Sequence, residues 1–141
     1  EWKPHSGDVI KWIEEVIKFG HNIRDKLIIS LSDNLEDWEI ILIEPLNSIT
    51  NSLNGIKHNL IKYEKSKEFR EEMERDLKKE YYNNLIYCDF HFLNNDIYKI
   101  EDDIKKLDKE SELYKNIDKI LTNSLLIIHI SFMIIFSRTF K

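Results

Sequence analysis

Cys88 and His91, in the segment CDFH, are the side chains whose types and spacing come closest to a reactive or metal-binding pair. Three residues apart, they share one face of a helix, where a thiol and an imidazole can form a reactive pair or supply two metal ligands. The neighbours of Cys88 are apolar, however, and a lone cysteine in such surroundings is usually a small buried hydrophobic residue. The sequence therefore predicts no catalytic, cofactor-binding or metal-binding residues.

Motifs of several large enzyme classes are missing. The three glycines are scattered, so they cannot form a glycine-rich loop that binds nucleotide phosphates. None of the five histidines follows a glutamate by three residues, the spacing that carries di-iron sites in helical bundles. His-Glu-x-x-His and Gly-x-Ser-x-Gly are absent too. Asp102 and Asp103 beside Glu101 lack a further ligand with suitable spacing, which favours a solvated turn. We therefore expect a protein that is not an enzyme.

Basic residues are concentrated in the middle of the chain. Residues 46–79 contain eight lysines and arginines and six acidic residues, whereas the whole chain has a formal net charge of −5. If an anionic partner exists, we expect it to contact these side chains: Lys57, Lys62, Lys65, Arg70, Arg75, Lys78 and Lys79. The alternative is a solvated helix face with interspersed glutamates. The acidic balance of the chain argues against nucleic acid as a partner, because that binding relies on a basic surface.

The residues around these positions indicate helices. Three glycines and two prolines supply too little turn chemistry for a sandwich or barrel of many short strands. Apolar residues separated by three and four positions, as in packed or coiled-coil helices, run through Leu46, Ile49, Leu53, Ile56, Leu60 and Tyr63, and continue at Phe69, Met73, Leu77 and Tyr81. A turn near residues 63–68 and one helix running straight through them are both compatible with this pattern.

Other residues predict where helices begin and end. A first helix is expected from about Asp8 to about Leu31, and a last one from about Glu112 into the C-terminal segment. Several residues in the rest of the chain are typical of helix breaks or starts. Gly20 and Pro45 are candidate breaks, Asp33 or Asn34 and Ser111 are candidate helix starts, and Asn94 and Asn95 form a candidate break with Asp96 as the next N-cap.

Residues 120–136, ILTNSLLIIHISFMIIF, are the most apolar segment. As a helix they would span about 25 Å, a little short of the ~30 Å hydrocarbon core of a bilayer. Two thin polar stripes lie almost opposite each other on a helical wheel: Ser124, Ser131 and Arg138 in one, Thr122 and His129 in the other. His129 would be costly in lipid but can be satisfied in a bundle. We therefore expect a largely buried core helix, with a C-terminal membrane anchor as the alternative.

Residues 38–82, WEIILIEPLNSITNSLNGIKHNLIKYEKSKEFREEMERDLKKEYY, resemble part of the BAR and F-BAR membrane-curving domains. In both, Pro-Leu follows an acidic, apolar helix and leads into a long lysine-rich helix. The resemblance covers about a third of the chain and rests on helix composition. Those domains are usually longer than this chain and have a more basic concave face. The resemblance implies binding to a membrane surface.

These observations predict an all-α, single-domain antiparallel bundle of four or five helices over residues 1–141, with a largely buried C-terminal helix. The opening residues fit a processed end or a fragment of a longer protein. The absence of Ala and Gln, with abundant Ile, Asn and Lys, indicates an AT-rich genome. For function, we expect a non-enzymatic module that binds another protein through a helical surface, with a membrane surface as the alternative partner and self-association left open. No cofactor is expected, and the sequence indicates no localisation.

Overall fold

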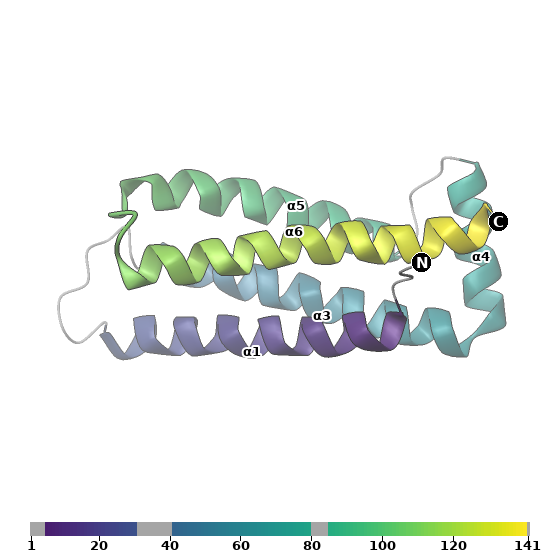
Figure 1. Ribbon diagram of the computed structural model, residues 1–141, viewed down its shortest axis with the longest axis horizontal. Helices are drawn as coiled ribbons and strands as arrows, with labels where there is room; N and C mark the ends of the chain where they lie inside the picture. The colour runs from purple at the N-terminus through teal and green to yellow at the C-terminus, as the bar shows by residue number, and fades with distance from the viewer. Residues whose placement is uncertain (1–4, 31–40, 80–84, 141) are drawn as a thin grey trace.

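Every regular element in the described part of the chain, residues 5–30, 41–79 and 85–140, is a helix (Figure 1). In this computed structural model the elements are α1 (Ser6–Ser30), α3 (Ile43–Lys65), α4 (Lys67–Lys78), α5 (Leu85–Asp103), the short 3-10 helix η2 (Ile104–Lys106) and α6 (Glu112–Thr139). The predicted all-α bundle is confirmed.

Four long helices lie lengthwise and antiparallel to their neighbours, and α4 crosses one end of the bundle (Figure 1). α3 packs against α1 on one side and α5 on the other, and α6 closes the ring by packing against both α1 and α5. The closest packing joins α3 to its two neighbours, whereas α6 is held less tightly. The start of α1 and the end of α6 lie near α4, at the same end of the bundle.

The apolar residues predicted to form a seam are the most deeply buried part of α3. None is more than 1% exposed, and they are Leu46, Ile49, Leu53, Ile56, Leu60 and Tyr63. Phe69, Met73 and Leu77 continue the buried face on α4, as predicted, while Tyr81 lies outside the described residues. This periodicity correctly identified the centre of the core.

Ser66 separates α3 from α4, so the chain turns here and does not continue as one straight helix. The backbone of Ser66 is extended, with φ −114° and ψ 112°, which ends the helical path. Its amide donates to the carbonyl oxygen of Lys62 at 2.8 Å, and its hydroxyl accepts from the amide of Phe69 at 3.2 Å. One residue therefore caps both helices and lets α4 turn across the bundle end.

Two of the predicted breaks are wrong, because α1 runs through Gly20 and α5 runs through Asn94–Asp96 without interruption. A Cβ atom on Gly20 would lie 2.9 Å from Cγ2 of Thr50, so glycine lets α1 approach α3 closely. Asp96 accepts a hydrogen bond from the hydroxyl of Ser48 on α3 at 2.6 Å instead of capping a helix. In both places an interhelical contact outweighs a weak local preference.

The other boundaries agree with the sequence where they can be compared. Ser111 accepts a hydrogen bond from the amide of Tyr114 at 3.2 Å, and α6 begins at the next residue, as predicted. Pro45 lies in the first turn of α3, where its missing N–H removes no intrahelical bond. The start predicted at Asp33 or Asn34 lies outside the described residues.

Truncation of the α3 seam should destabilise the whole fold. Leu53→Ala should lower the free energy of unfolding by about 2–5 kcal/mol, since Leu53 is completely buried and its loss leaves a cavity. Leu126→Ala, at a half-exposed position of α6, is the control and should cost about 1 kcal/mol or less. Urea denaturation followed by circular dichroism measures both. Equal midpoints for the two variants would contradict the seam.

A pair of glycine substitutions tests the close approach of α1 and α3. Gly20→Ala should destabilise the protein by about 1–3 kcal/mol, because the clash with Thr50 outweighs the gain in helix propensity. At Gly7 no atom lies within 4 Å of an added Cβ, so Gly7→Ala should be neutral or stabilising by up to about 1 kcal/mol. If thermal denaturation shows Gly20→Ala to be the more stable variant, the close approach is wrong.

Candidate functional site

Cys88 and His91 do not form a reactive or metal-binding pair in this structure. Cys88 is half-buried and His91 is exposed on α5, with a ring nitrogen of His91 3.3 Å from the side-chain nitrogen of Asn95. Within residues 5–30, 41–79 and 85–140, no group of three or more His, Cys, Asp or Glu side chains is arranged to hold a metal ion.

The acidic residues at the end of α5 lie at the edge of a cleft of about 430 Å³ between α3 and α5. Asp102 forms an exposed ion pair of 3.3 Å with Lys105, and Lys99 also lines the cleft. Such exposed ion pairs contribute little to binding or stability. Glu101 and Asp102 are exposed, so the segment is solvated as predicted, but it forms the last residues of α5 and not a turn.

Asp89 is the carboxylate most involved in contacts between α3 and α5. It lies where Gly55 has no side chain, and the amide group of Asn59 donates to Oδ2 of Asp89 at 3.0 Å. Burial raises the pKa of Asp89, although the hydrogen bond from Asn59 opposes this shift. Asp89 is thus committed to helix packing and is not directed into a cavity.

The seven basic residues predicted to contact an anionic partner are divided between two helices that meet at an angle. Lys57, Lys62 and Lys65 belong to α3, Arg70, Arg75 and Lys78 to α4, and Lys79 follows α4. Several are engaged within the protein. The ammonium group of Lys62 lies 4.7 Å from the ring centroid of Phe69.

Acidic side chains are interspersed with these basic ones on α4. The helix contains five acidic and four basic residues, and Arg75 and Lys78 line a shallow depression of about 270 Å³ together with Glu71 and Glu74. Lys67 also lies 3.8 Å from Glu71. The charges are therefore mixed on this helix, and a polyanion would meet both signs.

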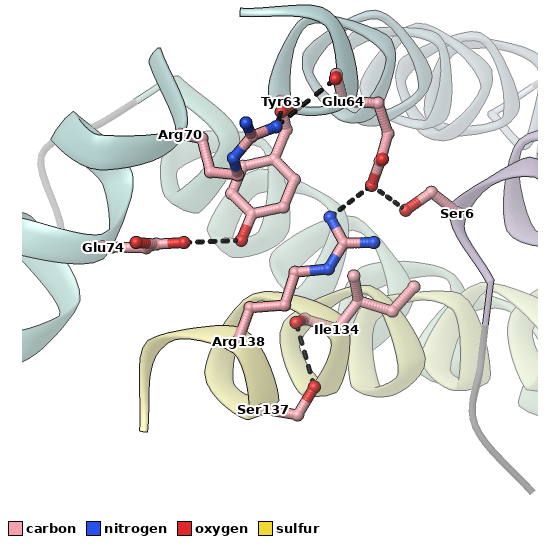
Figure 2. Close-up of polar contacts among 8 residues, drawn as sticks. All are labelled: Ser6, Tyr63, Glu64, Arg70, Glu74, Ile134, Ser137 and Arg138. Carbon is pink, nitrogen blue, oxygen red and sulfur yellow. Dashed lines mark hydrogen bonds and ion pairs between the residues drawn. The ribbon is translucent and has the colours of Figure 1, made fainter. Parts of the chain in front are cut away.

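A polar cluster joins four elements where α4 crosses the bundle (Figure 2). Glu64 Oε1, at the end of α3, accepts hydrogen bonds from the hydroxyl of Ser6 on α1 and from Nη1 of Arg138 on α6, both at 2.5 Å. Arg70 on α4 donates to the main-chain oxygens of Tyr63 and Glu64 at 3.0 and 3.3 Å. Arg70 thus satisfies carbonyl groups that the end of α3 leaves without helical partners.

Tyr63 lies at the centre of this cluster and is fully buried. Its hydroxyl donates to Oε1 of Glu74 at 3.3 Å, and the guanidinium of Arg138 lies 5.4 Å from its ring centroid (Figure 2). Burial raises the pKa of Tyr63 to about 12, with a further contribution from the negative charge of Glu74. The phenol is therefore neutral in the folded protein at physiological pH.

The pKa of Glu64 reflects opposing influences. Partial burial raises it, but the hydrogen bonds from Ser6 and Arg138 and the charges of Arg138 and Arg70 outweigh burial and lower the pKa below its ordinary value. Glu64 is consequently ionised at neutral pH and holds Arg138 in place. Because Ser6 is buried, this serine is inaccessible to a substrate. The cluster acts as a clamp between helix ends.

Helix α6 has two different faces, and its polar stripes lie on opposite sides as the helical wheel predicted. Ser124 and Ser131 are completely buried, and Arg138 points inward to Glu64. Among the described side chains, the hydroxyls of Ser124 and Ser131 are buried without a hydrogen-bond partner. Thr122 and His129 are exposed. The inner face thus contains the serines, and burial of α6 is confined to that side.

The other side of α6 is an exposed strip, which we call the outer face, and it combines the polar stripe of Thr122 and His129 with four large apolar residues. Its members recur at intervals of four and three residues, and they are Thr122, Leu126, His129, Met133, Phe136 and Phe140, the last of which is the C-cap of α6. Leu126, Met133, Phe136 and Phe140 are each between 47% and 53% exposed. The ring centroids of Phe136 and Phe140 lie 4.7 Å apart, and those of Phe132 and Phe136 lie 6.0 Å apart. No charged residue interrupts the strip, because the guanidinium of Arg138 is turned inward.

A small groove adjoins this helix on its α1 side. It has a volume of about 210 Å³ and is lined by side chains that include Trp12, Phe19 and Ile120. The indole nitrogen of Trp12 donates to the side-chain oxygen of Asn123 at 3.0 Å, and the ammonium of Lys119 lies 4.9 Å from the ring centroid of Phe19. Glu15 also lines the groove, which therefore adds both polar and apolar area beside α6.

By length and composition, α6 is the one helix in the described part of the chain that could cross a membrane. Its most apolar 18-residue window has a mean hydropathy of 2.0, and 39% of that window is buried in the bundle. The core helix of a soluble protein can have the same properties. Hydropathy alone therefore does not distinguish a protein partner from a lipid partner.

Comparison with known proteins finds no matching family model, no matching curated protein and no matching solved structure. The candidate site consequently rests on the geometry described above.

The sequence pattern correctly identified the polar stripes of α6 but did not identify the outer face as exposed. The signal was present, since Thr122 and His129 are the first and third members of a strip whose residues recur at intervals of four, three, four, three and four. The clamp formed by Ser6, Glu64 and Arg138 was also missed. These residues are far apart in sequence, and no local pattern pairs them.

Stability at high pH should report the burial of Tyr63. Between pH 10 and pH 12 the unfolded protein loses the phenolic proton while the folded protein keeps it, so the free energy of unfolding should fall as pH rises. Across this interval Tyr63 should account for about 2–3 kcal/mol of that fall. Urea denaturation of wild type and Tyr63→Phe measures the difference. Tyr98→Phe, at an exposed position, is the control and should retain the wild-type pH dependence.

Proposed function

We propose that this protein is a non-enzymatic helical binding module that contacts another protein through the outer face of α6. The observation that carries the proposal is the half-exposure of four large apolar side chains along one uncharged strip of this helix. A contiguous exposed apolar patch on a folded domain typically marks an interaction site. Phe and Met are also enriched at the centres of protein interfaces, where charged residues are depleted.

The spacing of the outer face suits a helical partner. Residues separated alternately by four and three positions line one side of a helix, and a second helix can insert its side chains between them. Ring contacts, stacked between Phe132 and Phe136 and tilted between Phe136 and Phe140, limit the rotamers available before binding. Less side-chain entropy is then lost when a partner docks, which favours association.

The polar side chains of the clamp and of the α3–α5 contact favour a binding role over a catalytic one. Glu64, Arg138 and Tyr63 hold helix ends together, and Asp89 holds α5 against α3. A catalytic group must reach a substrate, whereas these side chains are directed at one another. The proposal of a non-enzymatic role rests on this use of the polar groups.

A membrane surface is the second candidate partner, favoured by the uncharged, highly apolar window of α6. In that case the outer face would enter the boundary between lipid headgroups and acyl chains. The acidic net charge and the mixed charges of α4 supply little attraction to anionic lipids. We therefore place the protein partner first.

Selection of helical peptides tests the proposed function. A displayed library of amphipathic helices, screened against the purified protein, should yield binders with apolar residues at intervals of three and four. The double substitution Leu126→Ser with Met133→Ser should weaken their binding at least about tenfold, because it removes apolar contact area. Binding to immobilised protein is the measurement.

The matched control is Phe92→Ser with Tyr98→Ser, which removes two exposed aromatic side chains from α5. This control should bind the selected peptides as well as wild type does, and both double variants should keep a cooperative thermal transition. Failure to select any helix, or equal binding by both double variants, would contradict the proposal. Binding of zwitterionic vesicles through Leu126 and Met133 would instead support the membrane candidate.

A further inference from the structure

We infer that the outer face of α6 binds the outer face of a second copy of this chain, in an antiparallel, two-fold symmetric pair. This inference rests on the proposed function and names the partner of the same surface. Three properties of the outer face carry it: the order of its side chains along the helix, the absence of charge and its area.

The order of side chains makes the strip complementary to itself. The intervals between its six members read four, three, four, three, four in either direction, with the midpoint at the level of Ser131. In an antiparallel pair centred there, Leu126 meets Phe136 of the second copy, His129 meets Met133, and Thr122 meets Phe140. Each of the two phenylalanines thus faces a smaller side chain, as close packing requires.

A parallel pair would lack this complementarity. Every residue would then meet its own counterpart, so that Phe136 and Phe140 would each oppose a ring of the same size. Two copies of His129 would also meet, which would place two polar rings against each other in the middle of the strip. The antiparallel arrangement separates the histidines and alternates large with small side chains. A two-fold interface of this kind closes on itself and needs no further copies.

Charge favours the same arrangement. Between Lys119 and Arg138 the sequence contains no charged residue, and Arg138 is held inward by Glu64. In the antiparallel register, Arg138 lies at the level of Ser124 of the second copy, so no pair of like charges meets between residues 122 and 140 of the two strips. Lipid does not require a particular order of large and small side chains, so the order found in the outer face would not strengthen its binding to a bilayer.

The area of the outer face sets the strength of the pair. Four large side chains, each about half exposed, present on the order of 400 Å² of apolar surface per copy. A stable interface usually buries about 800 Å² per partner, so this one belongs to the weak class. The dimer therefore forms and dissociates with concentration, with a dissociation constant on the order of micromolar.

Sedimentation equilibrium measures the association directly. At concentrations from about 1 µM to about 500 µM, which span the expected dissociation constant, the protein should change from monomer to dimer. Leu126→Glu places a carboxylate against the ring of Phe136 of the second copy, where it has no partner, and should weaken association at least about 100-fold. Tyr98→Glu, which adds the same charge at an exposed aromatic position of α5, should associate like wild type.

Disulfide formation tests the register and the direction. In a Cys88→Ser background, Leu126→Cys and Phe136→Cys are prepared as separate proteins and then mixed under oxidising conditions. The mixture should give the 126–136 disulfide between copies, because these positions face each other in the antiparallel pair. Each protein alone should not cross-link efficiently, since equivalent residues lie about 15 Å apart along the helix axis. Efficient cross-linking of each protein with itself would indicate a parallel pair and overturn the inference.

The remaining outcomes separate this inference from the proposed function. A protein that stays monomeric at all concentrations overturns self-association, and if the selected helical peptides still bind the outer face, the proposed function stands. If the monomer binds neither peptides nor itself but co-sediments with phosphatidylcholine vesicles through Met133, both proposals are wrong and a bilayer is the partner. Should Leu126→Glu fail to fold, the mixed cross-linking of the two cysteine variants still decides the question.

Discussion

The fold depends on the complete burial of one apolar strip on α3. Residues from Leu46 to Tyr63 that recur every three or four positions are almost inaccessible to solvent, which requires other helices around this strip. α1 and α5 flank α3, and Gly20 and Gly55 remove the side chains that would keep these helices apart. The strip continues past Ser66 onto α4, so α4 must bend across the bundle end to bury Phe69 and Met73. The hydrophobic effect thus determines both the ring of helices and the position of the crossing helix.

Polar contacts then determine how the helices are aligned. Ser48 with Asp96, Asn59 with Asp89, and Trp12 with Asn123 join helices at different heights in the bundle. Individually such bonds contribute about 1 kcal/mol, and a shifted register would leave partly buried polar groups without these partners. At the end beside α4, Glu64 brings together the beginning of α1 and the end of α6.

The rotation of α6 about its axis determines which of its side chains are buried in the bundle and which remain exposed for binding. Turning Arg138 inward satisfies Glu64 and buries Ser124 and Ser131, whose hydroxyls find no partner among the described groups. The small serines allow close approach to the core, and the same rotation leaves Met133, Phe136 and Phe140 in solvent. A monomer gains nothing from this exposure, since an apolar surface in water is unfavourable. The outer face is therefore the part of the structure that association with another molecule would stabilise.

The sequence alone determined the helical class, the buried strip of α3, the cap at Ser111 and the two opposite polar stripes of α6. All of these follow from local periodicity or from one residue acting on its own backbone. Tertiary structure decided that Gly20 and Asn94–Asp96 do not interrupt their helices, because contacts with other helices outweigh small differences in local propensity. It also decided which stripe of α6 faces the core. A helical wheel shows that the stripes are opposite but not which side has neighbours. That choice depends on packing against helices distant in the sequence, which buries Ile127, Ile134 and Ile135, and the contact of Arg138 with Glu64, 74 residues away in the chain, accompanies it.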